Sequence, residues 1–402
     1  MLDNLKIENF RMLCDFEISK LGNVNLIVGK NNSGKSSVLE ALRVFAARGN
    51  PRVLQDIASS HDEIGISTPS SDESVELEKV IPFRDFFYGR KFPDGDEKKA
   101  IYIGDKERSK FTQIDHAFYL DDFEKITSTE GEETTRRKRQ IISKNLLLTE
   151  PIVADQALLV SVNETQTTGW IPLADIPSSP RRTPGSLFWE RAVREIPVSY
   201  VPTQFLSLDY LAQLWDSILL SKYQDDVKAS LKILDDDFED LGFIKTGSSE
   251  YADPRFRANR LRYRYSDRTA VVKLKNSSTR IPLSSMGDGM LRVLQLALTV
   301  FPAKGGILLI DEFENGLHWS IQEKIWTMIF KLATELDIQV FATTHSEDAV
   351  KAFSNVASSR PEEGVLIKLV RKPAADGVGG TIAVVYDEQT LRTATQTETE
   401  VR

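Results

Sequence analysis

Apolar positions near the N-terminus predict two strands and a helix. Residues 5–10 have a strand-like pattern, residues 24–28 are a short apolar run, and residues 36–47 repeat apolar side chains at helical spacing. A short apolar run is typical of a strand, whereas recurrence every three to four residues is typical of an amphipathic helix. The chain is therefore expected to open as strand, strand and helix, with a glycine-rich turn between the second strand and the helix.

Beyond residue 283 the pattern alternates between helix and strand. Helices are expected at 289–300, at 320–336 and after His345, and they are separated by apolar strands at 307–310 and 339–342. This alternation indicates a parallel sheet flanked by helices. We therefore expect an α/β fold with a mainly parallel core sheet. Further strand-like runs occur at 198–202, 365–370 and 382–386.

The middle of the chain is less regular. Residues 51–195 hold short strand-like pieces broken by Ser, Pro and charged clusters, which indicates an inserted α+β lobe, and the charged run at 127–139 suits a mobile loop. Four segments are expected: 1–50, the first part of the main fold; 51–195, the inserted lobe; 196–260, a helical segment; and 261–402, the second part of the main fold.

The helical segment is expected to contain two short amphipathic helices between Phe205 and Leu241, with Leu234 and Phe238 on the apolar face of the second one. No heptad pattern persists long enough for a coiled-coil arm. After them, residues 261–265 and 271–274 resemble two paired strands around a Ser266-Asp267 turn.

Composition narrows the classes of protein. The net charge is −8, which disfavours coating of nucleic acid by charge alone, and the single cysteine, Cys14, excludes a disulfide within the chain. The first residues, MLDNLKIENF, lack the basic and then apolar pattern of a secretory leader, so export is not expected, and no apolar run approaches the roughly 18 residues that a membrane span needs. A cytoplasmic protein that does not enter the membrane is expected.

The most specific pattern is the loop between the strand at 24–28 and the helix at 36–47. It consists of Gly29, Lys30, Asn31, Asn32, Ser33, Gly34, Lys35, Ser36 and Ser37. In a G-x-x-x-x-G-K-S loop, backbone N–H groups surround the phosphates, the lysine reaches the β- and γ-phosphates, and the serine hydroxyl can bind Mg²⁺. A chance glycine-rich loop is disfavoured by the flanking strand and helix. ATP and Mg²⁺ are the expected cofactors.

The strand at 307–310 ends in two acids that suit the same chemistry. Asp311 would hold Mg²⁺ through its water shell, and Glu312 is placed to orient or deprotonate the water that attacks the γ-phosphate. The alternative is an apolar strand that ends in solvated acids. A phosphate-binding loop earlier in the chain favours the functional interpretation.

The order of the motifs resembles that of ABC/SMC-like ATPases. These proteins carry a serine-glycine signature at a helix start shortly before the acidic strand, and here Ser285 and Gly287 occupy that place. The resemblance implies that this loop binds the γ-phosphate of ATP held by an opposite subunit, so that a homodimer or higher homo-oligomer shares its ATP sites. A simple helix cap is the alternative. His345 looks like the switch histidine, which contacts the γ-phosphate; a structural histidine is its alternative.

Local strings refine the resemblance. The opening strand at 5–11, the Asn-Asn form of the loop, and the extended acidic run at 311–318 are similar to the RecF/OLD-like branch, called AAA15. The likeness covers residues 1–50 and about 195–355. Many members are ATPase subunits of anti-phage systems, similar to Gabija, Septu and PARIS. Only 57 residues follow His345, too few for the Toprim nuclease of OLD proteins, so a separate effector, a nuclease or toxin, is expected.

Two assignments within this resemblance stay open. In ABC-like heads a glutamine links the inserted lobe to Mg²⁺ and the attacking water, and Gln204 is the candidate here; a glutamine on a helix start at the surface is the alternative. DNA contact is the second. Arginines between Arg255 and Arg268, interleaved with aromatic residues, suit nucleic acid, but a salt-bridged or solvated strand is at least as well supported. The run 136–139 is expected to be a flexible loop.

The resemblance leaves three functions. The first is a sensor or gating ATPase of a bacterial anti-phage defence system. The second is a RecF-like DNA-repair ATPase. The third is the nucleotide-binding subunit of a transporter, which the long inserted lobe and the extended acidic motif disfavour.

Overall fold

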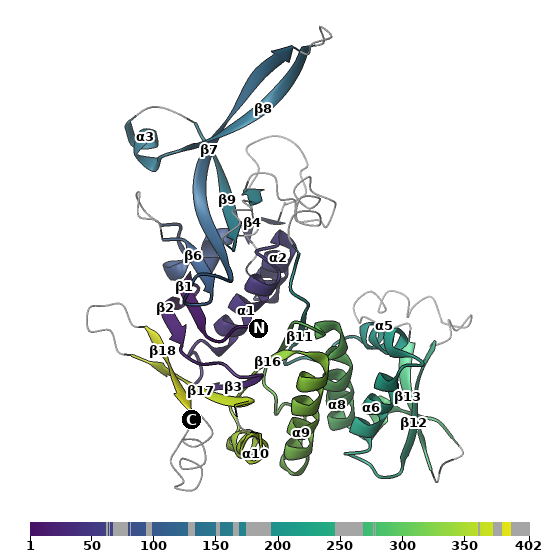
Figure 1. Ribbon diagram of the computed structural model, residues 1–402. Helices are drawn as coiled ribbons and strands as arrows, with labels where there is room; N and C mark the ends of the chain where they lie inside the picture. The colour runs from purple at the N-terminus through teal and green to yellow at the C-terminus, as the bar shows by residue number, and fades with distance from the viewer. Residues whose placement is uncertain are drawn as a thin grey trace.

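The structure of the protein is a computed structural model. It describes residues 1–61, 63, 65–66, 79–80, 82–93, 99–127, 133–149, 153–163, 169–173, 194–245, 268–275, 277, 279–360, 362–372 and 380–386. The α/β fold with a mainly parallel core sheet is confirmed. Figure 1 shows this sheet at the centre of the molecule, between helices and a second sheet.

The core sheet has the strand order β11-β15-β16-β3-β17-β18. Its strands are β3 (Val24–Gly29), β11 (Val198–Val201), β15 (Ile307–Ile310), β16 (Gln339–Thr344), β17 (Gly364–Arg371) and β18 (Thr381–Tyr386). The first five are parallel to one another, and β18 pairs antiparallel with β17. Parallel strands place their carboxyl ends at one edge, and residues at that edge can form a single site.

The second sheet is antiparallel. It contains strands from residues 1–50 and from residues 51–195, which were expected to belong to two different segments. Its order is β10-β9-β7-β6-β1-β2, with β8 paired to β7. The strands are β1 (Leu5–Phe10), β2 (Leu13–Ile18), β6 (Ile101–Gly104), β7 (Phe111–Thr127), β8 (Glu133–Ile142), β9 (Asp155–Val162) and β10 (Gly169–Pro172). Because β6 pairs directly with β1, the strands of the expected lobe continue a sheet that begins at the N-terminus.

The charged run at 127–139 was expected to be a mobile loop, and this is wrong for most of it. Residues 133–139 belong to β8, which forms a long hairpin with β7 that projects from the body of the protein (Figure 1). The register explains why charged residues form a strand here. Asp121 lies opposite Arg139, and Arg139 Nε donates a hydrogen bond to Asp121 Oδ1 at 3.1 Å. A cross-strand pair of opposite charge stabilises a hairpin, so this pair favours a strand at the end of the basic run.

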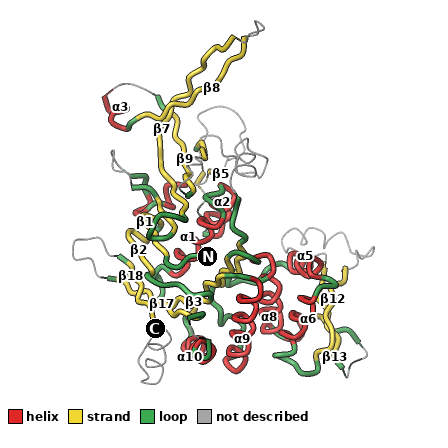
Figure 2. Tube along the Cα trace, viewed as in Figure 1, coloured by secondary structure: helices red, strands yellow, loops and turns green. Residues whose placement is uncertain are grey.

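Helices pack on both faces of the core sheet, and α1, α8, α9 and α10 are among them. The helices of the described residues are α1 (Lys35–Ala46), α2 (Pro51–Ser60), α3 (Lys144–Thr149), α5 (Leu208–Ile218), α6 (Lys222–Leu231), α8 (Asp288–Thr299), α9 (Trp319–Leu336) and α10 (Glu347–Ala357). Side chains of α8, α9 and α10 pack with Leu308 and Ile310 on one face, and α1 packs with Ile307 and Leu309 on the other. Figure 2 shows α5, α6, α8 and α9 grouped on the same side of the molecule.

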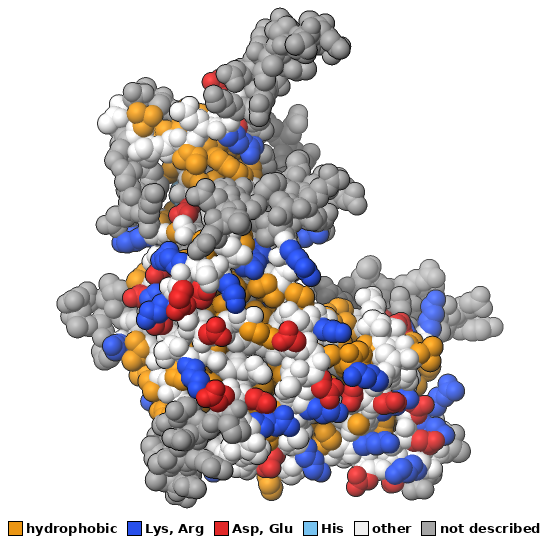
Figure 3. Space-filling model, viewed as in Figure 1, with side chains coloured by type: hydrophobic (Ala, Val, Ile, Leu, Met, Phe, Trp, Pro, Cys, Tyr) orange, Lys and Arg blue, Asp and Glu red, His pale blue; other side chains and the backbone are white. Residues whose placement is uncertain are grey.

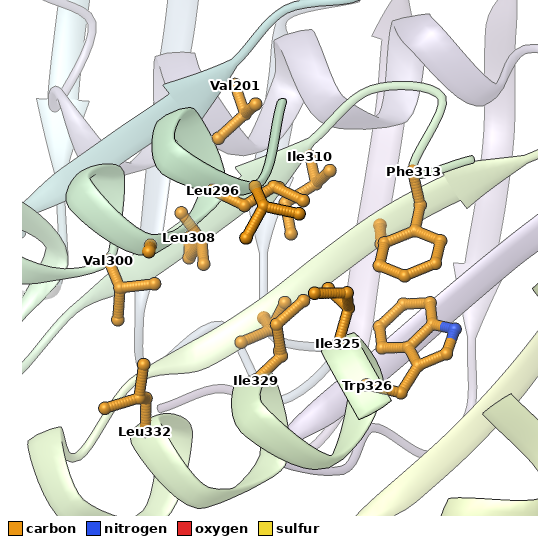
Figure 4. Close-up of a cluster of buried hydrophobic side chains, with 14 of the residues drawn as sticks. Val201, Leu296, Val300, Leu308, Ile310, Phe313, Ile325, Trp326, Ile329 and Leu332 are labelled. Atoms are coloured by element: carbon orange, nitrogen blue, oxygen red, sulfur yellow. The ribbon is translucent and has the colours of Figure 1, made fainter. Parts of the chain in front are cut away.

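A stacked aromatic pair anchors the segment after β15. The rings of Phe313 and Trp326 lie 3.9 Å apart at 17°, and both side chains are fully buried. Figure 4 shows them face to face, beside Ile310 and Ile325. Such a pair contributes about 0.5–1.5 kcal/mol beyond the burial of its area. The backbone immediately before Phe313, which carries Asp311 and Glu312, is therefore held against α9.

Three sequence predictions in the region 205–286 have different outcomes. The two amphipathic helices are present as α5 and α6, but α6 ends at Leu231. Phe238 was placed on that helix and instead begins β12 (Phe238–Lys245), because Asp235, Asp236 and Asp237 favour a turn before it. The strand at 271–274 is part of β13 (Arg268–Leu274), which pairs with β12 and with β14 (Ile281–Pro282). Its expected partner at 261–265 lies outside the described residues.

The described residues include no candidate membrane helix, and their visible surface carries charges of both signs. None of the helices among them combines the length and apolar character needed to cross a bilayer. In Figure 3 acidic and basic side chains alternate over the described part of the visible face, so neither sign dominates it. Cys14 has a free thiol and is only partly buried.

Candidate functional site

The expected site residues gather at the carboxyl edge of the core sheet. Gly29 ends β3, Asp311 follows β15, His345 follows β16, and Gln204 follows β11 by three positions. In the register, Ile310 lies beside both Val201 and Ala342, so these strands end at nearly the same level. Four strands therefore present their loops to one place, which is where ligands bind in open parallel sheets.

The glycine-rich loop has the backbone that phosphate binding needs. Asn32 and Gly34 have positive φ angles of 59° and 101°, which turn successive N–H groups toward the same side of the loop. A Cβ at Gly29 would lie 2.7 Å from Ser33 Oγ, so the tight turn requires glycine. Ser33 is buried and its hydroxyl has no partner among the described atoms. α1 begins directly after this loop, without a side-chain cap.

Lys35 connects the loop to the acidic strand. Its amino group is buried and donates hydrogen bonds to the carbonyls of Gly29 (2.7 Å) and Lys30 (3.1 Å). Burial lowers the pKa of Lys35, and the charges of Asp311, Glu312 and Glu314 act in the opposite direction. The ammonium group therefore lies in the field of three carboxylates that come from a segment 276 positions later (311 minus 35).

Thr343 on β16 fixes the two acids relative to each other. Its hydroxyl donates to Asp311 Oδ1 (2.7 Å) and accepts a hydrogen bond from the backbone N–H of Glu312 (2.9 Å). Glu312 has a φ of 46°, in the left-handed region, and its side chain is about two-fifths exposed. The backbone thus turns sharply after β15, so that Asp311 and Glu312 point in different directions.

Glu314 and His345 link the loop that follows β15 to the loop that follows β16. Glu314 accepts hydrogen bonds from Thr344 Oγ1 (2.7 Å) and from the backbone N–H of His345 (2.7 Å). His345 Nε2 lies 3.5 Å from Glu312 Oε1. The structure therefore brings His345 next to Glu312. Sequence reasoning assigned no role to Glu314, which lies within the acidic run at 311–318, or to Thr343, which lies between the strand expected at 339–342 and His345.

Arg292 is a buried cation that sequence reasoning missed. It lies on α8 and donates to the backbone carbonyls of Pro202 (2.7 Å), Asp311 (2.9 Å) and Glu312 (2.9 Å). Its side chain is fully buried, and burial lowers its pKa to about 10 despite the nearby acids. The signal was an arginine on the apolar face of a predicted helix, where a charge needs specific partners.

We expect Arg292→Lys to slow hydrolysis without unfolding the protein. Lysine keeps the charge but cannot reach three carbonyls in a fixed fork, so the backbone of Glu312 becomes less constrained. Because misplacement of a reacting group by about 1 Å costs up to about 100-fold, kcat should fall by roughly tenfold or more while the KM for ATP changes little. Steady-state ATPase assays and a thermal melt check this. An unchanged kcat in a folded variant would argue against a positioning role.

Ser285 and Gly287 lie apart from the loop contacts described above. Ser285 is exposed in a 3₁₀ turn (Leu283–Met286), and Gly287 precedes α8 with a φ of 94° and open space where a Cβ would stand. No side chain caps the start of α8. The start of α8 is therefore exposed and has no side-chain cap, and the same helix carries Arg292.

Gln204 is exposed, and the hydrogen bond that involves it uses its carbonyl, which accepts from Gln295 Nε2 at 3.4 Å. Its neighbour Thr203 accepts a hydrogen bond from Asn315 Nδ2 (2.6 Å), which ties this segment to the acidic loop. Gln204 thus lies at the right edge of the sheet, and its expected role toward Mg²⁺ remains a prediction.

The basic stretch expected to contact nucleic acid is described only at Arg268. That side chain pairs with Asp216, and its backbone N–H donates to Asp209 (2.9 Å). Residues 255–264 lie outside the described part of the chain. Arg268 therefore agrees with a salt-bridged strand, which was the alternative to nucleic-acid contact.

Two family models match successive parts of the chain. Residues 1–167 match the family described as "AAA ATPase domain", and residues 209–350 match the family described as "AAA domain, putative AbiEii toxin, Type IV TA system". The first segment contains the glycine-rich loop. The second contains Ser285, the acidic strand and His345.

Three curated proteins are similar to the chain. An "ATP/GTP phosphatase" of Helicobacter pylori is 21% identical over 376 residues, which cover 89% of this chain and 88% of that protein. Two uncharacterized proteins of Methanocaldococcus jannaschii match shorter segments. MJECL11 is 37% identical over 86 residues (21% of this chain, 75% of that protein), and MJECL10 is 47% identical over 45 residues (11% and 20%).

Solved structures of SMC heads also resemble the chain, at low identity. An SmcHead bound to the C-winged helix domain of ScpA has a TM-score of 0.48 at 13% identity, with 98% of this chain and 99% of that chain covered. The SMC head domain from Thermotoga maritima has a TM-score of 0.40 at 11% identity, with 95% and 98% covered.

The matched ATPase domains, the glycine-rich loop and the parallel sheet define this chain as a P-loop ATPase. It belongs to the same family as MJECL11, three quarters of which it covers at 37% identity.

Proposed function

We propose that the carboxyl edge of the core sheet binds ATP with Mg²⁺ and that a second copy of the chain completes the site. The observation that supports this most is the position of Lys35, a buried ammonium group in the glycine-rich loop that lies in the field of Asp311, Glu312 and Glu314. Phosphate-binding and metal-binding groups are thereby combined in one place.

The residues present fit both cofactors. Ser33 has a buried hydroxyl without a partner among the described atoms, and the loop N–H groups turn to one side, as a phosphate cradle requires. Ser36 and Asp311 supply hard oxygen atoms, which Mg²⁺ prefers. Ser36 is exposed, and Asp311 Oδ2 lies 3.5 Å from the hydroxyl of Tyr200. When bound, the metal neutralises charge on the transferred phosphoryl group.

Each side chain then has a distinct task in hydrolysis. Lys35 binds the β- and γ-phosphates, for which it gives up its hydrogen bonds to the loop carbonyls. Glu312, partly exposed and held by a sharp backbone turn, orients the attacking water and accepts its proton. His345, 3.5 Å from Glu312, contacts the γ-phosphate and senses its loss. Gln204 links the inserted lobe to Mg²⁺ and the attacking water.

The second copy contributes the start of α8. Ser285 and Gly287 are exposed, and the uncapped N–H groups of that helix suit an anion. In a two-fold dimer each copy would present this loop to the γ-phosphate held by the other. Arg292 on the same helix donates hydrogen bonds to the carbonyls of Asp311 and Glu312. A shift of α8 on binding of the second copy would therefore also move the backbone of these two acids.

Mixing two inactive variants tests the shared site. Lys35→Ala and Ser285→Arg should each be nearly inactive alone, because each damages a different half of both sites. A mixed dimer has one intact site, so an equimolar mixture should recover roughly a quarter of wild-type ATPase activity if the sites act independently. Each variant at doubled concentration is the control.

Failure of the mixture to recover activity contradicts sharing, provided that both variants still associate. Sedimentation of the Glu312→Gln variant with and without ATP measures that association directly. A monomer at every ATP concentration would remove the second copy from the mechanism.

In the cell, this ATPase acts as the sensor or gate of a bacterial anti-phage defence system, together with a separate nuclease or toxin. Two observations support the role: the RecF/OLD-like form of the motifs, and the match to a family whose description includes a toxin of a type IV TA system. Co-expression with the neighbouring genes, followed by phage challenge, tests it. Protection should require both Lys35 and the partner gene, whereas full protection by Lys35→Ala would reject the role.

A further inference from the structure

A small cavity lies at the edge of the core sheet opposite the ATP site. Its volume is about 80 Å³, and its walls include Phe45, Arg48, Lys110, Ile307, Asp337 and Gln339. β15 begins at Ile307 and β16 begins at Gln339, whereas the ATP site lies where these strands end. α1 spans the distance between them, about 18 Å for 12 residues. The cavity is therefore separate from the ATP site.

Arg48 gives the cavity its chemistry. Its side chain is 8% exposed, and its Nε and Nη1 atoms are buried without a hydrogen-bond partner among the described residues. The guanidinium carbon lies 5.0 Å from the centre of the Phe45 ring, which supports it from one side. Burial lowers the pKa of Arg48. A buried guanidinium with two of its three nitrogen atoms unsatisfied is unfavourable unless an anion compensates it.

The remaining walls are arranged to hold a ligand rather than to neutralise Arg48. Lys110 adds a second positive charge, and its amino group donates to the carbonyl of Met1 at 2.9 Å. Gln339 binds both the N–H and the carbonyl of Leu2, which fixes the N-terminal backbone beside the cavity. Asp337 is the acid among the wall residues; it is exposed, and no ion pair joins it to Arg48 in the described structure.

We propose that this cavity binds a small oxyanion, the phosphoryl or carboxylate group of a small metabolite, through Arg48. The size agrees with this class of ligand, because a water molecule occupies about 30 Å³ of liquid and the cavity accommodates a group of a few heavy atoms. Two cations and one exposed acid on the walls favour a negative charge. The apolar faces of Phe45 and Ile307 would contact the remainder of the ligand.

Thermal unfolding of the full chain tests the site. The Lys35→Ala background is used, because the glycine-rich loop also binds phosphate. Inorganic phosphate and, separately, acetate are titrated at constant ionic strength. At about 100 times the dissociation constant, the Tm should rise by about 3 °C. The same titration of Lys35→Ala with Arg48→Met should show no rise, and Lys35→Ala with Lys304→Gln, which removes an exposed charge outside the cavity, should keep it.

The two anions distinguish the form of the ligand: a rise with phosphate alone indicates a phosphoryl group, and a rise with acetate indicates a carboxylate. A rise that persists in the Arg48→Met variant, or no rise with either anion in the Lys35→Ala protein, overturns the proposal. If Arg48→Met does not fold, equilibrium dialysis of labelled phosphate and, separately, of labelled acetate against the Lys35→Ala protein should find one site per chain for at least one of the two anions; no binding of either anion overturns the proposal. The result does not depend on whether ATP is shared between copies.

Discussion

Replacing Glu312 by glutamine should lower the rate of ATP hydrolysis by about 100-fold or more while ATP binding persists. Glutamine keeps the shape of the side chain but cannot accept a proton from the attacking water, and general-base catalysis contributes roughly 10²–10⁴-fold. The left-handed backbone at Glu312 and its contacts through Thr343 do not involve the carboxylate, so the site should stay intact. Single-turnover hydrolysis and nucleotide binding on the same preparation separate the two effects.

Glu314→Gln is the matched control for this variant. Glu314 lies two positions away, and its two carboxylate oxygens accept hydrogen bonds from Thr344 and from the N–H of His345. In the glutamine variant the amide oxygen can accept from the N–H of His345, and the amide NH2 can donate to the Thr344 hydroxyl, which accepts as well as donates. Its kcat should therefore fall much less than that of Glu312→Gln. If both variants retained wild-type turnover, neither carboxylate would act as the base, and the assignment of Glu312 would be wrong.

Replacing Lys35 by alanine should weaken ATP binding by about tenfold to 100-fold and abolish turnover. A hydrogen bond between an ammonium group and a phosphate contributes about 1.5–3 kcal/mol, and no other lysine or arginine is assigned to the phosphates here. The free protein should tolerate the change, because the hydrogen bonds lost are two to loop carbonyls. Titration with a fluorescent ATP analogue, alongside a thermal melt, measures both quantities.

Lys30→Ala provides the comparison for Lys35→Ala. Lys30 is exposed in the same loop, and only its backbone carbonyl contacts Lys35. We expect its ATP affinity to stay within about threefold of the wild type, since a screened surface charge contributes little. Equal losses in the two variants would mean that general loop charge, rather than Lys35, holds the nucleotide.

The core of this fold could be predicted from sequence because its signals are local. Apolar runs at β3, β15 and β16, each followed by a helix or a polar loop, indicate parallel strands without any knowledge of contacts. The acidic pair and the glycine-rich loop stand at strand ends, and parallel strands bring such ends together. The convergence of Lys35 with Asp311 therefore followed from the order of the elements.

Other features depend on contacts between distant residues and were missed for that reason. The strand β8 reads as a charged loop until the acids of β7 are placed opposite it. In the sequence Arg292 cannot be distinguished from other charged residues, because the three carbonyls that it binds belong to two distant loops. Phe238 kept the helical spacing of the preceding residues, and the turn at Asp235–Asp237 outweighed that spacing. For β8 and Arg292 the structure is decided by residues that are distant in the sequence. For Phe238 it is decided by a local turn that overrides the helical spacing.

The position of β3 in the sheet has a consequence for how the protein is made. β3 is synthesised early, yet its hydrogen-bonded neighbours are β16 and β17, near the other end of the chain. Thr381 also donates a hydrogen bond to the carbonyl of Ser33, 348 positions away. At about 5–20 residues per second, a ribosome needs roughly 20–70 s to proceed from Gly29 to Arg371. During that interval β3, which leads into the nucleotide loop, lacks its neighbours in the sheet, so the growing chain acquires its capacity to hold ATP only after β16 and β17 have been synthesised.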